Sequence, residues 1–253
     1  MPEAPPEARW FAPLSAFPGK IPMNSPLPRE PIFEVLAFLE DSVPRGAALQ
    51  MALDQALLEV TDIPVLRVYQ WDAPCVTIGY FESVAAAIAA HPGLPVVRRW
   101  TGGGLVVHGK DAPYSLIVPQ SEPFAAVRAA SAYRVLHGNL AEALRRRLPD
   151  IALAAESAPK QSAACFENPV SDDLLCGGNK IGGAGQRRTR QGLLHQGSLQ
   201  LQGARFEEAR LFAVLLAARV QHVHLSPGTL LHAKRLAESR YALPAWNADR
   251  RKE

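Results

Sequence analysis

Apolar residues recur at steps of three and four between positions 45 and 60, at Leu49, Ala52, Leu53, Ala56, Leu57 and Val60. This stripe predicts an amphipathic helix over 45–60. Two runs rich in β-branched and aromatic residues follow, over 65–71 and 75–80, and Asp72-Ala73-Pro74 separates them. Such a spacing is typical of two strands joined by a tight turn, so we expect a hairpin here.

A break at Gly102-Gly103-Gly104 divides the next strand-like stretch. Short strands are predicted before the break, over 96–99, and after it, over 105–108 and 114–118. Ser121 and Pro123 then predict the start of a helix, because serine can cap a helix and proline is tolerated in its first turn. An apolar stripe continues this helix to Leu144.

The second half of the chain predicts three more strands, over 174–176, 181–186 and 193–201, and the turn residues between them favour a meander. Residues 205–241 have helical periodicity, interrupted at Ser226-Pro227-Gly228. The strands come in antiparallel-looking pairs with helices between them. This order predicts an α+β fold rather than a doubly wound parallel sheet.

The composition, 48% hydrophobic and 20% charged over 253 residues, is that of a globular protein. Eight of the 22 prolines lie in the first 30 residues, where neither period is present. We therefore expect a disordered proline-rich tail over 1–30 and one domain over 31–245. No run approaches the roughly 18 apolar residues of a membrane span, and no secretory signal begins the chain, so a cytoplasmic protein without a membrane partner is expected. The net charge of +3 is too small to indicate nucleic-acid binding.

Three cysteines, an odd number without a C-x-x-C pair, indicate neither a disulfide framework nor a cysteine zinc site. His222, His224 and His232 are better explained as solvated positions than as zinc ligands, so we predict no metal. Cys75 and Cys176 lie in strand-like runs and are expected in the core. Cys165 lies in a polar loop, where a neighbouring cation would make it a reactive thiolate.

The triple glycine follows Arg98 and Arg99 and precedes His108. Consecutive glycines weaken a sheet unless something approaches the backbone closely, so this segment is a candidate cradle for a phosphate or carboxylate. A flexible turn flanked by solvated arginines explains the residues equally well. The spacing matches neither the Walker loop nor the G-x-G-x-x-G fingerprint of dinucleotide-binding folds.

A second glycine-rich segment, Gly177 to Arg188, contains Lys180. The small neighbours would let a bound group contact the Lys180 ammonium, which could stabilise developing negative charge or lower the pKa of a thiol. A surface lysine in a hairpin turn is the alternative. His108 and His195 each border a glycine-rich segment, which makes them candidate ligand contacts.

Several motifs occur in order between about 45 and 201: Gln50-Met51-Ala52-Leu53-Asp54-Gln55-Ala56-Leu57-Leu58, Tyr69-Gln70-Trp71-x-x-Pro74-Cys75-Val76-Thr77-Ile78-Gly79-Tyr80-Phe81, Arg98-Arg99-x-Thr101-Gly102-Gly103-Gly104-x-Val106-x-His108, Cys165-Phe166, Asn179-Lys180-Ile181-x-Gly183 and His195-Gln196-Gly197-Ser198. Together they resemble the superfamily of biotin and lipoate protein ligases and octanoyltransferases. The resemblance implies that superfamily's catalytic domain over 31–245, a mixed, largely antiparallel sheet packed with helices.

The resemblance also implies a set of site residues. The family's catalytic lysine corresponds to Lys180. Substrate binding falls to Arg99, Thr101, Gly102, Gly103, Gly104, Leu105, Val106, Val107, His108, Gly183 and His195, and Leu105 and Val107 are candidates for bounding an acyl tunnel. Gly182 and Gly185 stand where the family commonly has alanine and serine, which puts in doubt how tightly the acyl chain is held.

Two activities are compatible with this family. Cys165-Phe166, fifteen residues before Lys180, resembles octanoyltransferases in which that cysteine carries the acyl group and the lysine lowers its pKa. An octanoyl or lipoyl group would then pass from acyl carrier protein to a lysine of a lipoyl carrier domain without a cofactor, with Arg187, Arg188 and Arg190 attracting the acidic carriers. The alternatives are an ATP- and Mg²⁺-dependent lipoate-protein ligase and a non-catalytic lipoate- or biotin-binding module.

Overall fold

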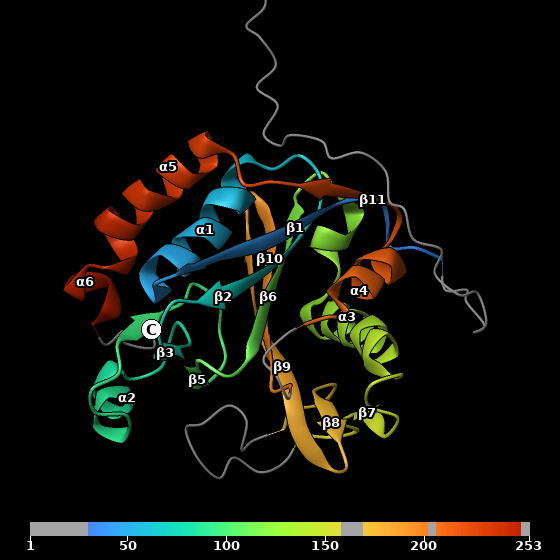
Figure 1. Ribbon diagram of the computed structural model, residues 1–253, viewed down its shortest axis with the longest axis horizontal. Coiled ribbons are helices and arrows are strands. Elements are labelled where there is room, and N and C mark those ends of the chain that lie inside the picture. The colour runs from blue at the N-terminus through green and yellow to red at the C-terminus, as the bar shows by residue number, and fades with distance from the viewer. Residues whose placement is uncertain (1–29, 158–168, 202–205, 249–253) are drawn as a thin grey trace, which may run out of the picture.

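The computed structural model describes residues 30–157, 169–201 and 206–248 (Figure 1). The tail predicted over 1–30 therefore lies, except for Glu30, outside the described residues, and so does Cys165. Within the described part of the chain, the principal sheet has eight strands, in the spatial order β11 (Ala217–Val223), β1 (Phe33–Arg45), β2 (Val65–Trp71), β6 (Ala112–Pro119), β10 (Gly192–Leu199), β9 (Asn179–Thr189), β8 (Leu174–Cys176) and β7 (Ile151–Leu153).

A second, smaller sheet has the order β4 (Val96–Arg98), β3 (Cys75–Ile78) and β5 (Val106–His108). In the principal sheet β11 and β2 run parallel to β1, and the other neighbouring strands are antiparallel. In the smaller sheet β4 is parallel to β3 and β5 is antiparallel to it. The expected α+β fold with a mixed, largely antiparallel sheet is confirmed.

Helices cover both faces of the principal sheet (Figure 1). One face packs against α1 (Ala47–Val60), on which α5 (Pro227–Leu236) lies, and the other against α3 (Ala129–Leu144) and α4 (Ala209–Leu216). Strand alternation sorts the side chains of β10 between these layers: Leu193 and Leu199 join the core beside α3, whereas Leu194 packs on the α1 side. Alternate residues of β9 and β10 therefore point to opposite faces of the principal sheet.

The smaller sheet lies beside the α1 face, where α2 (Val84–Ala90) and the short C-terminal helix α6 (Pro244–Asn247) contact β4. A π-helical turn over Ala237–Tyr241 connects α5 to this region. The chain leaves the principal sheet after β2 and returns to it in β6. The connection between them is the stretch that carries the triple glycine.

The strands predicted over 65–71 and 75–80 are present as β2 and β3, but the hairpin is wrong. β2 pairs with β1 and β6, and β3 pairs with β4 and β5, so the Asp72-Ala73-Pro74 turn carries the chain from one sheet to the other. A tight turn fixes a change of direction and not a pairing partner, because a strand joins whichever neighbour satisfies its backbone and buries its side chains.

Two other expectations change. Residues 217–223, predicted as helix, form β11, whose backbone pairs with β1, a strand that the sequence did not predict. The helix expected from Ser121 begins at Ala129, after a separate 3₁₀ turn over Pro123–Ala126. The meander is confirmed as β8, β9 and β10, and the helix over 45–60 as α1.

Candidate active site

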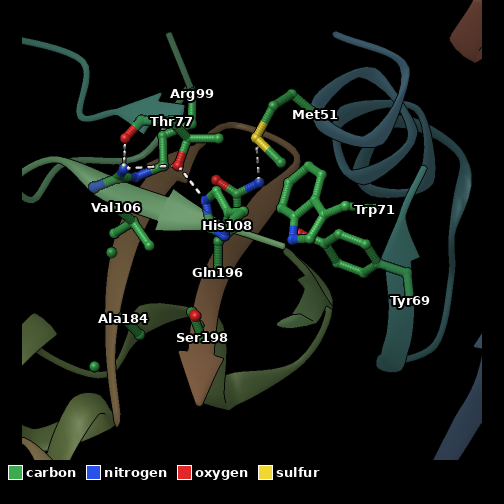
Figure 2. Close-up of a pocket in the computed structure, with 13 residues that line it drawn as sticks. Met51, Tyr69, Trp71, Thr77, Arg99, Val106, His108, Ala184, Gln196 and Ser198 are labelled. Carbon is green, nitrogen blue, oxygen red and sulfur yellow. Dashed lines mark hydrogen bonds between the residues drawn. The ribbon is translucent and has the colours of Figure 1, made fainter. Parts of the chain in front are cut away.

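A hollow of about 440 Å³, counting its open mouth, lies between the smaller sheet and the α1 face of the principal sheet (Figure 2). Its lining comes from α1, β2, β3, β5, β9, β10 and the segment after β4. The lining residues are Met51, Tyr69, Trp71, Thr77, Arg99, Val106, His108, Gly183, Ala184, Gly185, Gln196, Gly197 and Ser198. The fold thus gathers segments that lie almost 150 positions apart in the sequence.

A chain of hydrogen bonds crosses the wall of the hollow (Figure 2). Arg99 Nη1 donates to Thr77 Oγ1 at 3.2 Å, and Thr77 Oγ1 lies 2.8 Å from His108 Nε2. His108 Nδ1 in turn lies 2.7 Å from a carboxylate oxygen of Asp111, and Ser198 Oγ donates to the same oxygen at 2.6 Å. Burial opposes the charge on Asp111, but the bonds from His108, Ser198 and the Gly109 N–H outweigh it and lower the pKa of Asp111.

The two arginines before the triple glycine bind backbone and not an exposed cradle. Arg98 is fully buried and donates to five carbonyl oxygens, those of Gly79, Tyr80, Glu82, Asn247 and Ala248. Arg99 lines the hollow, yet it too donates to carbonyl oxygens, those of Thr77, Gly102 and Gly104. The hypothesis of a cradle that includes the Arg98 guanidinium is therefore wrong, because that group holds the C-terminal segment against the smaller sheet.

Strand alternation divides the residues after the triple glycine. Val106 and His108 line the hollow, whereas Leu105 packs with Val76, Ile78 and Ala87 beneath α2. Val107 is 42% exposed. Leu105 and Val107 point away from the hollow, so Val106 takes the place expected of them as an apolar wall.

The two glycine-rich segments meet. A Cβ at Gly185 would overlap the carbonyl oxygen of Gly102 and lie 3.0 Å from Thr101 Oγ1, so the missing side chain lets β9 touch the triple-glycine segment. Thr101 Oγ1 donates to Gln196 Oε1 at 2.8 Å, and Gln196 Nε2 donates to Asp54 of α1 at 2.7 Å. The close neighbour that Gly185 accommodates is protein backbone.

Lys180 is buried beside the hollow and is not a surface turn residue. Its side chain is 2% exposed, and its Nζ lies 2.7 Å from a carboxylate oxygen of Asp173, whose own side chain is 1% exposed. A Cβ at Gly183 would lie 2.9 Å from Lys180 Cε and 3.1 Å from Nζ. Gly183, which lines the hollow, therefore leaves the space that the end of the lysine occupies.

His195 lies on the opposite face of the sheet from Gln196 and Ser198 and is fully buried. Its ring nitrogens lie 3.1 Å from Gln186 Nε2 and 3.3 Å from Tyr114 Oη. Burial lowers its pKa well below the ordinary value, so it is neutral near pH 7. Its place beneath α3 separates it from the hollow that His108 lines.

The described cysteines fit the expected core positions to different degrees. Cys75 is buried, and burial together with Asp111 and Asp72 raises the pKa of its thiol to about 12, which leaves it unreactive at neutral pH. Cys176, on β8, is partly exposed. Among the described residues, no group of three or more His, Cys, Asp and Glu side chains could hold a metal ion.

Several lining residues escaped the sequence-based list, although they belong to the motifs quoted for the resemblance: Met51, Tyr69, Trp71, Thr77, Gln196 and Ser198. Trp71 stacks on His108 with ring centroids 4.3 Å apart, and its buried Nε1 has no hydrogen-bond partner in the described part of the chain. No sequence pattern marked Asp173 as a site residue, because only the folded chain brings it next to Lys180.

Residues 46–221 match the family model of the lipoyl protein ligase A/B catalytic domain. The chain is 36% identical over 178 residues to the octanoyltransferase LipM of Oceanobacillus iheyensis, a match that spans 66% of this chain and 64% of the relative. It is 32% identical over 192 residues to the octanoyltransferase LipM of Bacillus subtilis, spanning 70% of this chain and 68% of the relative. The first of these matches thus covers less than two thirds of the relative's length.

The fold is similar to that of the bipartite lipoate protein ligase of Thermoplasma acidophilum, with a TM-score of 0.64 and 19% identity over 87% of this chain and 99% of that one. At this identity the likeness concerns the fold. Within the described residues, no helix has both the length and the apolar character needed to cross a bilayer.

Proposed function

The chain belongs to the lipoyl protein ligase A/B catalytic-domain family, and from this premise we propose that it is an octanoyltransferase of protein lipoylation. It moves an octanoyl group from the thioester of an acyl carrier protein to a lysine of a lipoyl carrier domain. The observation that carries this proposal is the similarity to relatives named octanoyltransferase. The family match over 46–221 contains both Cys165 and Lys180. The reaction takes place in the cytoplasm and uses residues 31–245 as one catalytic domain.

The transfer proceeds in two steps through Cys165. The Cys165 thiolate attacks the carbonyl carbon of the carrier thioester, forms an octanoyl-cysteine thioester and expels the carrier as its thiolate. The neutral ε-amine of the recipient lysine then attacks the new thioester and forms an amide, while the carbon–sulfur bond breaks and releases the Cys165 thiolate. The proton that the nitrogen loses balances the one that the carrier thiolate takes up. No nucleotide is consumed, because the incoming thioester already activates the acyl group.

Lys180 supplies the positive charge for the thiolate. Its ammonium is buried beside the glycine-lined hollow, where a charge interaction is stronger than in water. Main-chain N–H groups of the glycine-rich segments are the candidate donors to the tetrahedral oxyanion, an effect worth on the order of 3 kcal/mol per donor. Val106 and Met51 give the acyl chain an apolar wall.

An ATP-dependent lipoate ligase is the second candidate, because the fold also resembles a lipoate protein ligase. If Arg98 and Arg99 held its triphosphate, the phosphates would displace the bonds that these arginines already make to carbonyl oxygens. Breaking such buried charged hydrogen bonds is costly, which favours a donor that brings no phosphate to these arginines.

The two reactions are separated by the donor that each accepts. Purified protein is mixed with a lipoyl domain and either octanoyl acyl carrier protein or free lipoate with ATP and Mg²⁺, and the mass of the lipoyl domain is measured by mass spectrometry. We expect octanoylation from the carrier thioester alone. Modification only with lipoate and ATP would establish the ligase, and modification with neither donor would favour a non-catalytic binding module.

A further inference from the structure

Tyr133 of α3 extends the contact between Lys180 and Asp173 into a longer chain. Tyr133 Oη donates to Asp173 Oδ1 at 2.5 Å, while Asp173 Oδ2 holds Lys180 Nζ at 2.7 Å. The same Tyr133 oxygen accepts a hydrogen bond of 2.9 Å from the backbone N–H of Ala184. Ala184 lines the hollow, so the chain connects the lysine's counter-ion to the wall of the site.

The Asp173 carboxylate is fixed from several directions. Its second oxygen also accepts the backbone N–H of Val170 at 2.7 Å, and its own backbone pairs with that of Ala154. A carboxylate held this way has one orientation toward Lys180, and the lysine loses the freedom of its four-carbon stem. Such rigidity is what a group needs when it must meet a thiolate at one place.

Other titratable groups around the pair are His137 of α3, Tyr114 of β6 and Asp172, which precedes Asp173 in the chain. Burial lowers the pKa of His137 to about 4, so it carries no charge against Lys180 at neutral pH. Burial and the Asp173 charge raise the pKa of Tyr133 well above its ordinary value, so its hydroxyl keeps the proton that it donates.

We propose that Asp173 and Tyr133 are positioning residues that hold the Lys180 ammonium in place for acyl transfer. The inference rests on the proposed function, in which Lys180 acts on the Cys165 thiolate. Asp173 supplies the counter-charge, and Tyr133 fixes Asp173 relative to the Ala184 backbone. Neither residue touches the acyl group.

The test compares transfer kinetics of Tyr133→Phe and Asp173→Asn over a range of pH. Tyr133→Phe should lower kcat about three- to tenfold, the usual effect of one lost hydrogen bond, with KM for the acyl carrier nearly unchanged. Asp173→Asn should lower kcat about a hundredfold or more, because it leaves a buried ammonium without this counter-ion. Its rate should also begin to decline at lower pH than that of the wild-type protein, since burial then favours the neutral amine.

Tyr241→Phe is the matched control, because Tyr241 is fully buried, donates to Gln55 and lies apart from the hollow. A structural effect alone would lower the melting temperature of Tyr133→Phe and Tyr241→Phe alike and leave kcat equal in both. An unchanged kcat in Tyr133→Phe overturns the proposal even if Asp173→Asn does not fold.

A second readout does not depend on transfer. Acetylation of Lys180 by acetic anhydride, followed by peptide mass spectrometry, reports the neutral amine and should be about tenfold faster in Asp173→Asn than in the wild-type protein. Equal acetylation in the two proteins contradicts the positioning role. If Lys180 is acetylated faster in Asp173→Asn but the wild-type protein itself transfers no octanoyl group, the positioning role is retained and the proposed function is rejected.

Discussion

Gly185 illustrates what a single missing side chain does in this fold. The sequence pointed to a glycine-rich segment beside Lys180, and a bound group was the expected reason for the glycines. At Gly185 the structure gives a different reason, since the Gly102 carbonyl occupies the space of a Cβ. A pattern of glycines predicts close approach, but only the fold determines which atoms approach.

Gly185→Ala should therefore destabilise the protein by about 1–3 kcal/mol, because the new methyl group must push the triple-glycine segment away from β9. Thermal unfolding measures the change. Gly228→Ala, in the first turn of α5, is the control, since the nearest atom to its Cβ is Ser226 Oγ at 3.8 Å and alanine favours a helix. Equal melting temperatures in the two variants would contradict the close contact.

Two buried histidines predict a dependence of stability on pH. The pKa of His137 is about 4 in the folded protein, below the value of 6.5 for an unfolded chain, and the pKa of His195 is lowered as well. The unfolded chain therefore binds more protons than the folded one below about pH 6.5, and the free energy of unfolding decreases as the pH is lowered. Between pH 7 and 4, His137 alone should remove about 3 kcal/mol.

Urea unfolding at a series of pH values measures this loss. His137→Gln removes the titrating group and should flatten the dependence, while the exposed His224 substituted by glutamine should leave it as in the wild-type protein. A stability that stays constant between pH 7 and 4 would show that neither histidine resists protonation.

At the scale of elements, the sequence predicted most of the helices and strands near the site but not their partners. Local periodicity was enough for α1, for β6 and for the meander that carries Lys180, because each has a regular pattern over its own length. β1 and β11 depend on pairing with each other, which joins positions 33 and 217. No local pattern contains that information, so the helical period over 217–223 was misleading.

The same limit applies to the site. The glycine segments, Arg99, His108 and Lys180 were identified from the sequence, and all of them lie in or beside the hollow. The side chains of Leu105, Val107 and His195, which were also expected at the site, lie away from the hollow. Side-chain direction in a strand depends on register, and the sequence does not give the register. Asp173 and Tyr133 come from separate elements and meet only in three dimensions.

Arg98 connects two elements that are distant in the sequence. Its side chain donates to carbonyl oxygens on both sides of the contact, while Trp246 Nε1 donates to the Arg98 carbonyl at 2.8 Å and Asn247 Oδ1 accepts its backbone N–H at 2.7 Å. The contact fastens α6 to β4, the strand that leads into the triple glycine. The C-terminal segment thus holds β4, and through β4 the start of the triple-glycine segment, in place.

Arg98→Lys should cost about 2–4 kcal/mol, because a single ammonium cannot serve carbonyl groups that a planar fork spans. Hydrogen exchange should rise in β4 and over 99–104 before it rises in the principal sheet. Asn247→Ala should give a smaller change of about 1 kcal/mol in the same region. If Arg98→Lys behaves like the control Arg235→Lys, which alters an exposed residue of α5, then α6 does not support the smaller sheet.

At the scale of the whole molecule, the three arginines expected to attract carriers occupy different positions. Arg187 stacks on Tyr80 and Trp100, with its guanidinium carbon 5.0 and 5.3 Å from the two ring centroids, and so lies next to the triple-glycine segment. Arg188 donates to Gln186 and to the Val127 carbonyl, and Arg190 is exposed in the turn after β9. Of the three, Arg187 is the one that contacts the residue immediately before Thr101 and the triple glycine.

Arg187→Glu should raise KM for the acyl carrier about three- to tenfold at low salt, and added salt should reduce the difference, because the attraction is electrostatic. Arg219→Glu makes the same change of charge on β11, at the opposite edge of the principal sheet, and should leave KM unchanged. Equal effects of the two substitutions would mean that net charge, and not this surface, governs the encounter.

The proposed transfer requires the acyl group to rest on Cys165 between the two carrier proteins. Mixing the protein with octanoyl acyl carrier protein in the absence of a recipient, then digesting it and analysing the peptides by mass spectrometry, tests this directly. We predict one octanoyl group on Cys165 that disappears when a lipoyl domain is added, and no adduct or transfer in Cys165→Ala. A Cys165→Ala protein that octanoylates the lipoyl domain as fast as the wild type would contradict covalent transfer through Cys165.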